Sequence, residues 1–207
     1  LGSIEMLMVV SGLQSGMFAF VSTFFGLIFI EKLGLSIFAG FQKKWIIAAL
    51  SVGVFSGLFI VLSDSLIFSS LLGEQTSNYQ FNIFYFLGGL IYGGVVEELL
   101  LRLFVMTGLI LFIQTLILRQ KDHKQQKPWV YITAITTSAL LFGALHLPAT
   151  ALMFDLSVGI VLRALLLNGI PGIAFGYLFW KHDLVHAMIA HAFTHVVMQL
   201  ILMPIFF

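Results

Sequence analysis

Long apolar runs are the feature that most constrains how this chain can fold. Runs such as Met6–Ile30 and Trp45–Leu72 exceed the roughly 20 residues that a helix needs to cross a hydrocarbon core about 30 Å thick. Of the 207 residues, 60% are hydrophobic and 9% are charged, against about 25% charged in an ordinary soluble domain. A soluble fold would expose much of this apolar surface to water, so lipid is the solvent that fits.

We therefore predict an all-α, polytopic transmembrane helical bundle of about seven spans, within a range of about six to eight, in a single membrane domain over residues 1–207. The expected spans are Met6–Ile30, Trp45–Leu72, Phe81–Leu118, Trp129–His146, Ala151–Leu167, Gly169–Trp180 and Leu184–Phe207. The third is long enough to bend, and Gly88-Gly89 and Gly93-Gly94 predict a bend or a close helix contact there. Gly172 and Gly176 have the spacing of a packing contact.

Basic residues gather in alternate loops. Glu31–Lys44 and Arg119–Lys127 are rich in lysine and arginine, whereas Gly73–Gln80 contains only the acidic Glu74 as a charged residue. Because cytoplasmic loops carry an excess of basic residues, we expect the two basic loops to be cytoplasmic and the amino terminus to lie outside. Lys181 breaks this alternation.

Composition and missing motifs exclude several classes of function. The formal charge of +1, with no basic patch among aromatic residues, excludes nucleic acid as an expected partner and leaves membrane lipids. The absence of cysteine excludes a thiol nucleophile and a disulfide framework. The sequence contains no P-loop, no H-E-x-x-H zinc motif and no G-x-S-x-G nucleophile turn.

Ionisable residues inside the third span are the first candidates for chemistry, because a charged group in hydrocarbon is costly and rarely kept without a function. Glu98 and Arg102 are four residues apart on one helix face, so they can pair. Glu97 points about 100° away and has no partner at that spacing. A desolvated carboxylate without a cation suits a general base, although a purely structural polar cluster of all three residues is the alternative.

Histidines in the later spans are the second set of candidates. His146 ends the fourth span and is weak evidence when taken alone. His191 and His195 are four residues apart and share a helix face, a spacing that can grip zinc or polarise a substrate carbonyl. We interpret His182 and His186, nearer the start of that helix, as peripheral. An acid that meets these imidazoles with water present would be equipped for hydrolysis.

The three motifs resemble those of the CAAX-protease and bacteriocin-processing family, CPBP, also called Abi. That family carries E-E-x-x-x-R, then F-x-x-x-H, then H-x-x-x-N or H-x-x-x-D. The matching residues here, in the same order, are Glu97-Glu98-x-x-x-Arg102, Phe142-x-x-x-His146 and His191-x-x-x-His195. The resemblance covers residues 80–200, which we expect to form the catalytic core.

The resemblance implies an intramembrane endopeptidase that hydrolyses a peptide bond in a hydrophobic, membrane-associated or lipidated peptide or protein. It also implies a multi-pass protein of the cell membrane of a prokaryote. By analogy, Glu97 assisted by His146 would activate water. Glu98 would support the site and Arg102 would hold it in place, while His191 and the residue four positions later would bind the scissile carbonyl and the developing oxyanion.

Position 195 departs from the family pattern, since His195 stands where Asn or Asp is usual. An imidazole can still donate to an oxyanion, so we favour a metal-free mechanism that needs no cofactor. The substitution also completes a plausible zinc set consisting of Glu97, His146, His191 and His195. A zinc-dependent peptidase, or a non-catalytic immunity or transport-type membrane protein, therefore remains an alternative.

Overall fold

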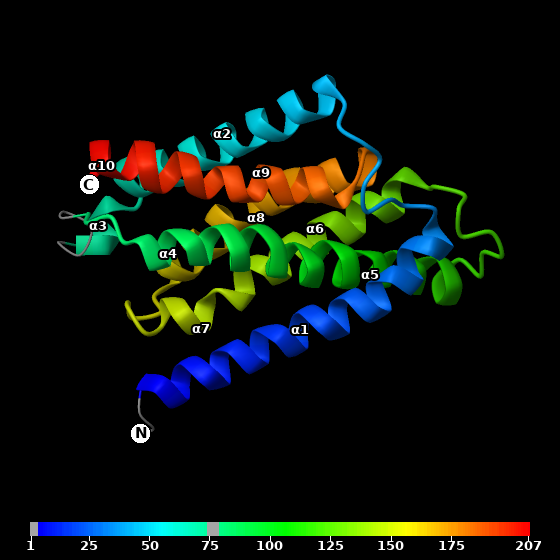
Figure 1. Ribbon diagram of the computed structural model, residues 1–207, viewed down its shortest axis with the longest axis horizontal. Helices are drawn as coiled ribbons and strands as arrows, with labels where there is room; N and C mark the ends of the chain where they lie inside the picture. Colours follow the sequence, from blue (N-terminus) through cyan, green and yellow to red (C-terminus); the bar gives the residue numbers. More distant parts are fainter. Residues whose placement is uncertain (1–3, 74–78) are drawn as a thin grey trace.

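The computed structural model describes residues 4–73 and 79–207, which form a bundle of long helices (Figure 1). Within these described ranges, six helices are long and apolar enough to cross a membrane. The six spans are Val9–Leu33, Lys43–Leu66, Ile83–Ile117, Pro128–Thr150, Val158–Lys181 and Leu184–Phe206. The predicted all-α transmembrane bundle is confirmed, and six spans fall within the predicted range. Glu74, which was part of the predicted loop pattern, lies outside the described residues.

Several spans contain more than one helical segment. The first two spans and the connection that follows them contain α1 (Ile4–Leu33), α2 (Lys43–Leu66) and the short α3 (Ser69–Leu72). The third span contains α4 (Ile83–Gly88), the π-helical η2 (Gly89–Glu97) and η3 (Leu99–Met106), α5 (Thr107–Phe112) and η4 (Ile113–Ile117). The remaining spans contain α6 (Pro128–Leu145), α7 (Leu147–Thr150), α8 (Val158–Lys181), α9 (Leu184–Val196), η5 (Val197–Leu202) and α10 (Met203–Phe206).

The predicted break between spans Ala151–Leu167 and Gly169–Trp180 is wrong, because the single helix α8 runs through it. Pro171 lies inside α8. Proline is tolerated in a membrane helix where neighbouring groups satisfy the backbone that it disturbs. The sequence pattern therefore overestimated the number of spans by one.

The start of α8 explains where the fifth span begins. Residues 151–157 form a turn and an extended segment rather than membrane helix, and Asp155 is exposed there. Ser157 then caps α8 by accepting the Ile160 N–H at 3.3 Å, which satisfies one of the free donors at a helix start. Asp155 is thus a loop residue and not a charge within a span.

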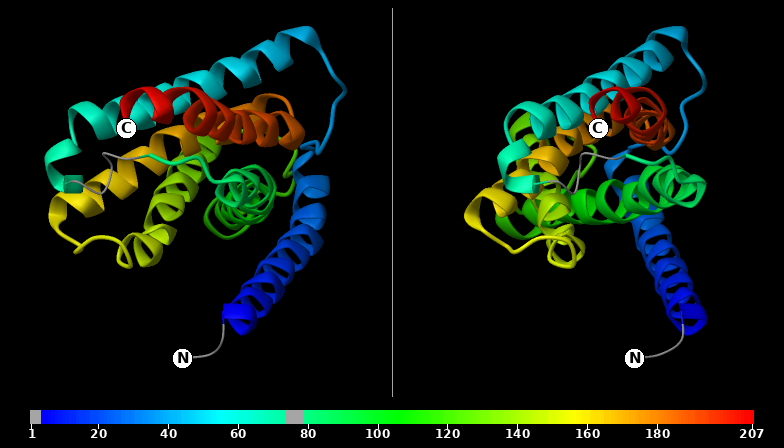
Figure 2. Two further views of the ribbon diagram at one scale, coloured as in Figure 1. Left: turned by 60° about the vertical axis from the view of Figure 1, so that its left-hand side comes forward. Right: turned by 90° about the vertical axis from the view of Figure 1, so that its left-hand side faces the viewer.

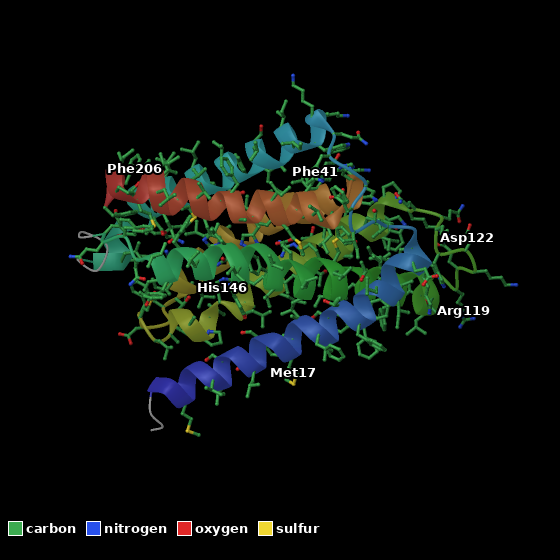
Figure 3. The ribbon with its side chains drawn as sticks, in the orientation of Figure 1. Met17, Phe41, Arg119, Asp122, His146 and Phe206 are labelled. Carbon is green, nitrogen blue, oxygen red and sulfur yellow. The ribbon has the colours of Figure 1, made fainter. Side chains whose placement is uncertain are left out.

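With six spans, the basic segments lie at one end of the bundle. Figure 3 shows Phe41, Arg119 and Asp122, from the first and third connections, at the same end. The end of α8 lies there too, since the Trp180 indole donates to the Gln126 side chain at 3.0 Å. Lys181 therefore agrees with the charge pattern instead of departing from it, and α1 begins and α10 ends at the opposite end (Figure 1).

Helix α9 lies centrally, where it packs against α2, α8 and η2, while α6 packs mainly against α8. Helix α1 packs against η3 and α5, and its first turns stand apart from the bundle (Figure 2). The fold thus places the last span, which carries two of the candidate histidines, beside the third span, which carries the candidate acids.

Bare glycine backbone allows the third and last spans to approach closely. A Cβ at Gly94 would lie 2.8 Å from the Ala192 Cβ, and one at Gly89 would lie 2.6 Å from His195 Nδ1. The predicted close helix contact is therefore confirmed. The predicted packing role of Gly172 is confirmed as well, because a Cβ there would lie 3.2 Å from the Ala139 Cβ on α6.

Candidate active site

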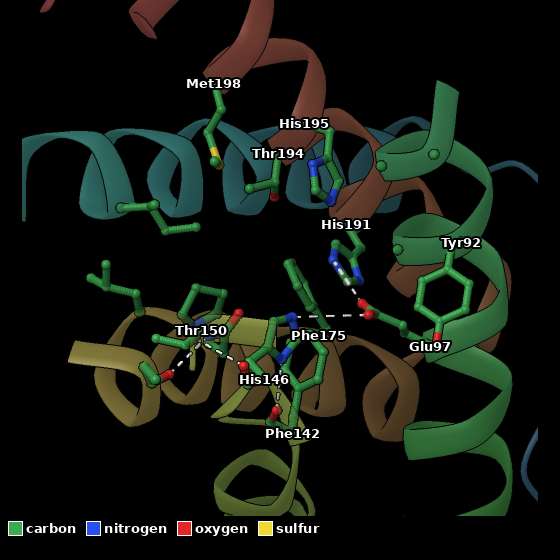
Figure 4. Close-up of a pocket in the computed structure, with 18 of the residues that line it drawn as sticks. Tyr92, Glu97, Phe142, His146, Thr150, Phe175, His191, Thr194, His195 and Met198 are labelled. Carbon is green, nitrogen blue, oxygen red and sulfur yellow. Dashed lines mark hydrogen bonds and ion pairs between the residues drawn. The ribbon is translucent and has the colours of Figure 1, made fainter. Parts of the chain in front are cut away.

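A cavity of about 450 Å³ brings together the candidate residues from three distant parts of the chain. Glu97 reaches it from the end of η2, His146 from the end of α6, and His191 and His195 from α9. Figure 4 shows these four side chains around one space, with His191 and His146 directed toward Glu97. The sequence motifs therefore meet in space as predicted.

Glu98 lies behind the wall of this cavity and is fully buried. Its Oε1 lies 2.8 Å from His191 Nδ1, so the imidazole N–H donates to the carboxylate. Its Oε2 lies 3.3 Å from Arg102 Nε, which confirms the predicted i, i+4 pair. Arg102 also donates from Nη2 to the Gly172 carbonyl at 3.1 Å, so the pair links three spans. Neither residue is among the described residues that line the cavity, and both hold His191 from outside it.

Glu97 faces the cavity and is 16% exposed. Its Oε1 lies 3.9 Å from His146 Nε2, and its Oε2 lies 3.8 Å from His191 Nε2. These distances are too long for direct hydrogen bonds, and polar groups at such a separation are commonly bridged by water. The carboxylate is therefore poised beside two imidazoles without being locked to either.

His146 is held by the residue four positions before it. Its Nδ1 lies 2.9 Å from the Phe142 carbonyl, so Nδ1 carries the hydrogen and donates. In the neutral ring, Nε2 then presents a lone pair toward Glu97. The Phe142 ring meets the imidazole edge to face at 4.8 Å, which gives the F-x-x-x-H spacing a physical reason. Thr150 donates to the His146 carbonyl at 2.9 Å and supports the helix end.

His195 is oriented by Gln199, which sequence reasoning missed. The Gln199 amide donates to His195 Nδ1 at 3.4 Å, so the neutral ring carries its hydrogen on Nε2. That Nε2 faces Gly93, where an added Cβ would lie 2.7 Å from it and 3.4 Å from His191 Nε2. The two rings are stacked with centroids 5.4 Å apart. The i, i+4 spacing of His195 and Gln199 was the available signal.

Comparison with known families agrees with this geometry. The sequence model described as type II CAAX prenyl endopeptidase, Rce1-like, matches residues 79–197, which is more than half of the chain. The chain belongs to this family. No curated protein and no solved structure matches it. The resemblance drawn from the three motifs is therefore confirmed, and the protein is a multi-pass membrane protein of a CAAX-type intramembrane protease family.

The Rce1-like match leaves α1 and α2 outside it, yet α2 contributes to the surroundings of the cavity. Asp64 on α2 forms a two-point ion pair with Arg163 on α8, with distances of 2.7 and 2.5 Å. Arg163 lines the cavity. Sequence reasoning did not single out either residue, although both are ionisable groups in apolar runs, which is the signal that identified Glu97.

A second cavity of about 350 Å³ adjoins the first in this Rce1-like protein. His146, Thr150 and Arg163 line both. Most of its other lining residues are apolar and comprise Leu72, Ala149, Met153, Phe154, Met203 and Phe207, with Asp64 and Tyr79 as the polar members. The space around Glu97 and the candidate histidines therefore lies beside a second, largely apolar one.

Proposed function

We propose that this protein is an intramembrane endopeptidase in which Glu97 activates water to hydrolyse a peptide bond. The observation that carries the proposal is the pair of gaps around the Glu97 carboxylate, 3.9 Å to His146 Nε2 and 3.8 Å to His191 Nε2. At that separation, a water molecule to the side of the acid and the imidazole can hydrogen-bond to both. General bases act on a proton within hydrogen-bond reach, and this placement provides that reach.

The reaction begins when Glu97 accepts a proton from water while the His146 Nε2 lone pair accepts the second hydrogen bond of that water. The oxygen forms a bond to the scissile carbonyl carbon, and the carbonyl electron pair moves onto its oxygen. His195 Nε2–H, oriented by Gln199, donates to this oxyanion. When the carbonyl re-forms, the C–N bond breaks and the leaving amine takes the proton held by Glu97.

His191 supports the oxyanion together with His195, and Glu98 and Arg102 act as positioning residues for it. The bond from His191 Nδ1 to Glu98 fixes the ring, and the carboxylate stabilises the positive charge that His191 needs if its Nε2 is to donate. These proposed roles use the residues of all three motifs and need no metal or other cofactor.

The substrate we propose is a hydrophobic, membrane-associated or lipidated peptide or protein. The apolar second cavity, next to the reaction space, suits an apolar segment or a lipid chain of such a substrate. The surrounding membrane lipids are the other expected partners. A soluble, polar peptide would gain little from this surface and should be a poor substrate.

Glu97→Gln tests the proposal, because the amide keeps the size of the side chain but cannot take a proton. We expect cleavage of a membrane peptide in liposomes to fall by about 10²–10⁴-fold, the usual contribution of a general base. Glu31→Gln, at an exposed position near the end of α1, is the matched control and should keep full turnover. Undiminished turnover by folded Glu97→Gln protein would overturn the proposal.

A zinc peptidase on the same residues is the second candidate, and the Glu98–His191 contact favours it. A carboxylate on one ring nitrogen commonly orients a histidine whose other nitrogen binds zinc. Metal analysis of wild-type protein purified without chelators, beside Glu97→Gln and His191→Ala, decides between the two. The zinc mechanism is supported if both variants lose zinc and if a chelator stops cleavage by the wild type. Cleavage that survives complete zinc removal supports the metal-free one.

A further inference from the structure

A second group of ionisable residues lies at the turn between α8 and α9, away from the cavity. In it, one donor atom from each of His182, Asp183 and His186 lies within 4.8 Å of those from the other two. Asp183 and His186 are fully buried, and the His182 side chain is 6% exposed. The description of His182 and His186 as merely peripheral is therefore incomplete, since both belong to a buried cluster.

Asp183 has most of its acceptor capacity in use. Its Oδ1 accepts the His186 backbone N–H at 2.8 Å and lies 2.7 Å from His186 Nδ1, while its Oδ2 accepts the Ala39 N–H at 2.8 Å. A carboxylate offers about four lone-pair sites, so about one is left. That oxygen, Oδ2, lies 3.5 Å from His182 Nε2. The helix-capping role of Asp183 thus leaves room for one further bond toward the cluster.

Two imidazole nitrogens in the cluster have nothing to bond to. Among the residues that the structure describes, neither His182 Nε2 nor His186 Nε2 has a hydrogen-bond partner, and both atoms are buried. Buried polar atoms are nearly always satisfied, so two such nitrogens side by side need a ligand or an explanation. Capping of α9 accounts for the buried carboxylate of Asp183, but it gives neither Nε2 atom a hydrogen-bond partner. The two imidazole rings lie against each other, with their centroids 4.4 Å apart.

We propose that His182, Asp183 and His186 bind a divalent transition-metal ion, zinc being the expected one. Two imidazoles and a carboxylate are a donor set that zinc prefers and that calcium and magnesium do not. Tetrahedral zinc with bonds of about 2.1 Å places its donors about 3.4 Å apart. The distance from His182 Nε2 to Asp183 Oδ2 is already 3.5 Å, and the third donor is His186 Nδ1, which lies 2.7 Å from Asp183 Oδ1 and binds the ion in place of that hydrogen bond. Water fills the fourth position.

The place of the site gives the ion a structural role. The backbone N–H groups of Leu184 and Val185 donate to the carbonyls of Ser36 and Ile37, at 3.2 and 3.0 Å, and Asp183 holds Ala39. The cluster therefore sits where the connection between α1 and α2 is tied to the start of α9. Because α9 also carries the histidines of the cavity, a bound ion would fix the helix that presents them.

Aromatic rings lie against both histidines of the cluster. The Trp45 ring stacks on His182 with centroids 4.7 Å apart and an interplanar angle of 9°, and the Phe41 ring lies 6.1 Å from His186. Such rings limit the access of water and hold the imidazole planes, as the surroundings of a structural metal do. The ion would consequently exchange slowly in the folded protein.

The test is metal analysis of the full-length protein, purified without chelators, loaded with zinc sulfate and freed of excess metal. We expect about one zinc per chain in the wild type, and less than about a tenth of that in His182→Gln and His186→Gln. The control variant His123→Gln, in the loop after the third span, should retain the ion. Cobalt added to the metal-free protein should give the visible absorption of a tetrahedral site, again lost in both variants.

Folding is checked by gel filtration, and His182→Gln, at the less buried position, serves if His186→Gln does not fold. Zinc should raise the melting temperature of the wild type but not of the variants. The proposal is overturned if the loaded wild type holds no zinc, or if both variants keep it. Zinc lost in His191→Ala but kept in His182→Gln would assign the ion to the cavity instead. Glu97→Gln should keep the ion whether or not it cleaves peptides, so this result is independent of the proposed activity.

Discussion

Gly93→Ala should inactivate the protein without unfolding it. A Cβ at Gly93 would lie 2.7 Å from His195 Nε2 and 3.4 Å from His191 Nε2, whereas ordinary contacts of a Cβ begin near 3.4 Å. The added methyl therefore has to displace the His195 ring by about 0.7 Å. A displacement of about 1 Å at a catalytic group costs about 10²-fold in rate, so we expect kcat/KM to fall about 100-fold, or about 2.7 kcal/mol in the barrier.

Stability should change less than activity in this variant. Alanine is better than glycine in a helix by about 1 kcal/mol, while overpacking costs about 1–3 kcal/mol, so the net loss of stability is about 0–2 kcal/mol. The assay is cleavage of a membrane peptide in liposomes, with melting temperature as the control for folding. Gly16→Ala on α1, where no described atom lies within 4 Å of an added Cβ, is the matched substitution and should stay active.

A double mutant tests whether the methyl acts through the imidazole. With His195→Ala the methyl of Gly93→Ala has space, so the two losses should not add. Fully additive losses, or a folded Gly93→Ala protein with wild-type turnover, would refute the reasoning that places His195 Nε2 at the reaction.

Three further predictions concern the supporting interactions and the orientation. Glu98→Gln removes the negative charge that pairs with the buried Arg102 and His191. Turnover in the peptide-cleavage assay should fall about 100-fold. The free energy of unfolding, followed by thermal melting, should fall by about 3–5 kcal/mol. Asp64→Asn should lower the free energy of unfolding by about 1–3 kcal/mol, and a melting temperature restored by adding Arg163→Met would show that the unpaired charge is the cause. Because the chain has no cysteine, Lys124→Cys and Leu152→Cys give unique labels, and an impermeant thiol reagent on intact cells should label only the second.

The number and place of most spans could be predicted from hydropathy, because a span needs a minimum length of apolar helix whatever it packs against. The error at residue 168 has the opposite cause. Whether Pro171 ends a helix depends on the groups that surround it, and the packing of α8 against α6 lies beyond any local pattern. Lys181 broke the expected alternation of basic loops only because the sequence pattern predicted one span too many.

The candidate site could be predicted as a set of residues but not as an arrangement. Helical spacing correctly paired Glu98 with Arg102 and grouped His191 with His195. The contact between Glu98 and His191 spans 93 positions, and no pattern within one helix predicts it. Tertiary contacts of this kind also explain why the ion pair between α2 and α8 was not foreseen.

Glu97 and Glu98 are adjacent and chemically identical, so their different roles must come from what the fold places around each. Glu98 is fully buried, with Arg102 at 3.3 Å and His191 at 2.8 Å, and it does not reach the described lining of the cavity. Glu97 has access to the cavity and to imidazoles that it does not touch directly. Removing Glu97 therefore cannot be compensated by its neighbour, because turning Glu98 inward would leave the buried arginine unpaired. In the proposed mechanism, the order of the two acids along the helix therefore decides which carboxylate meets water.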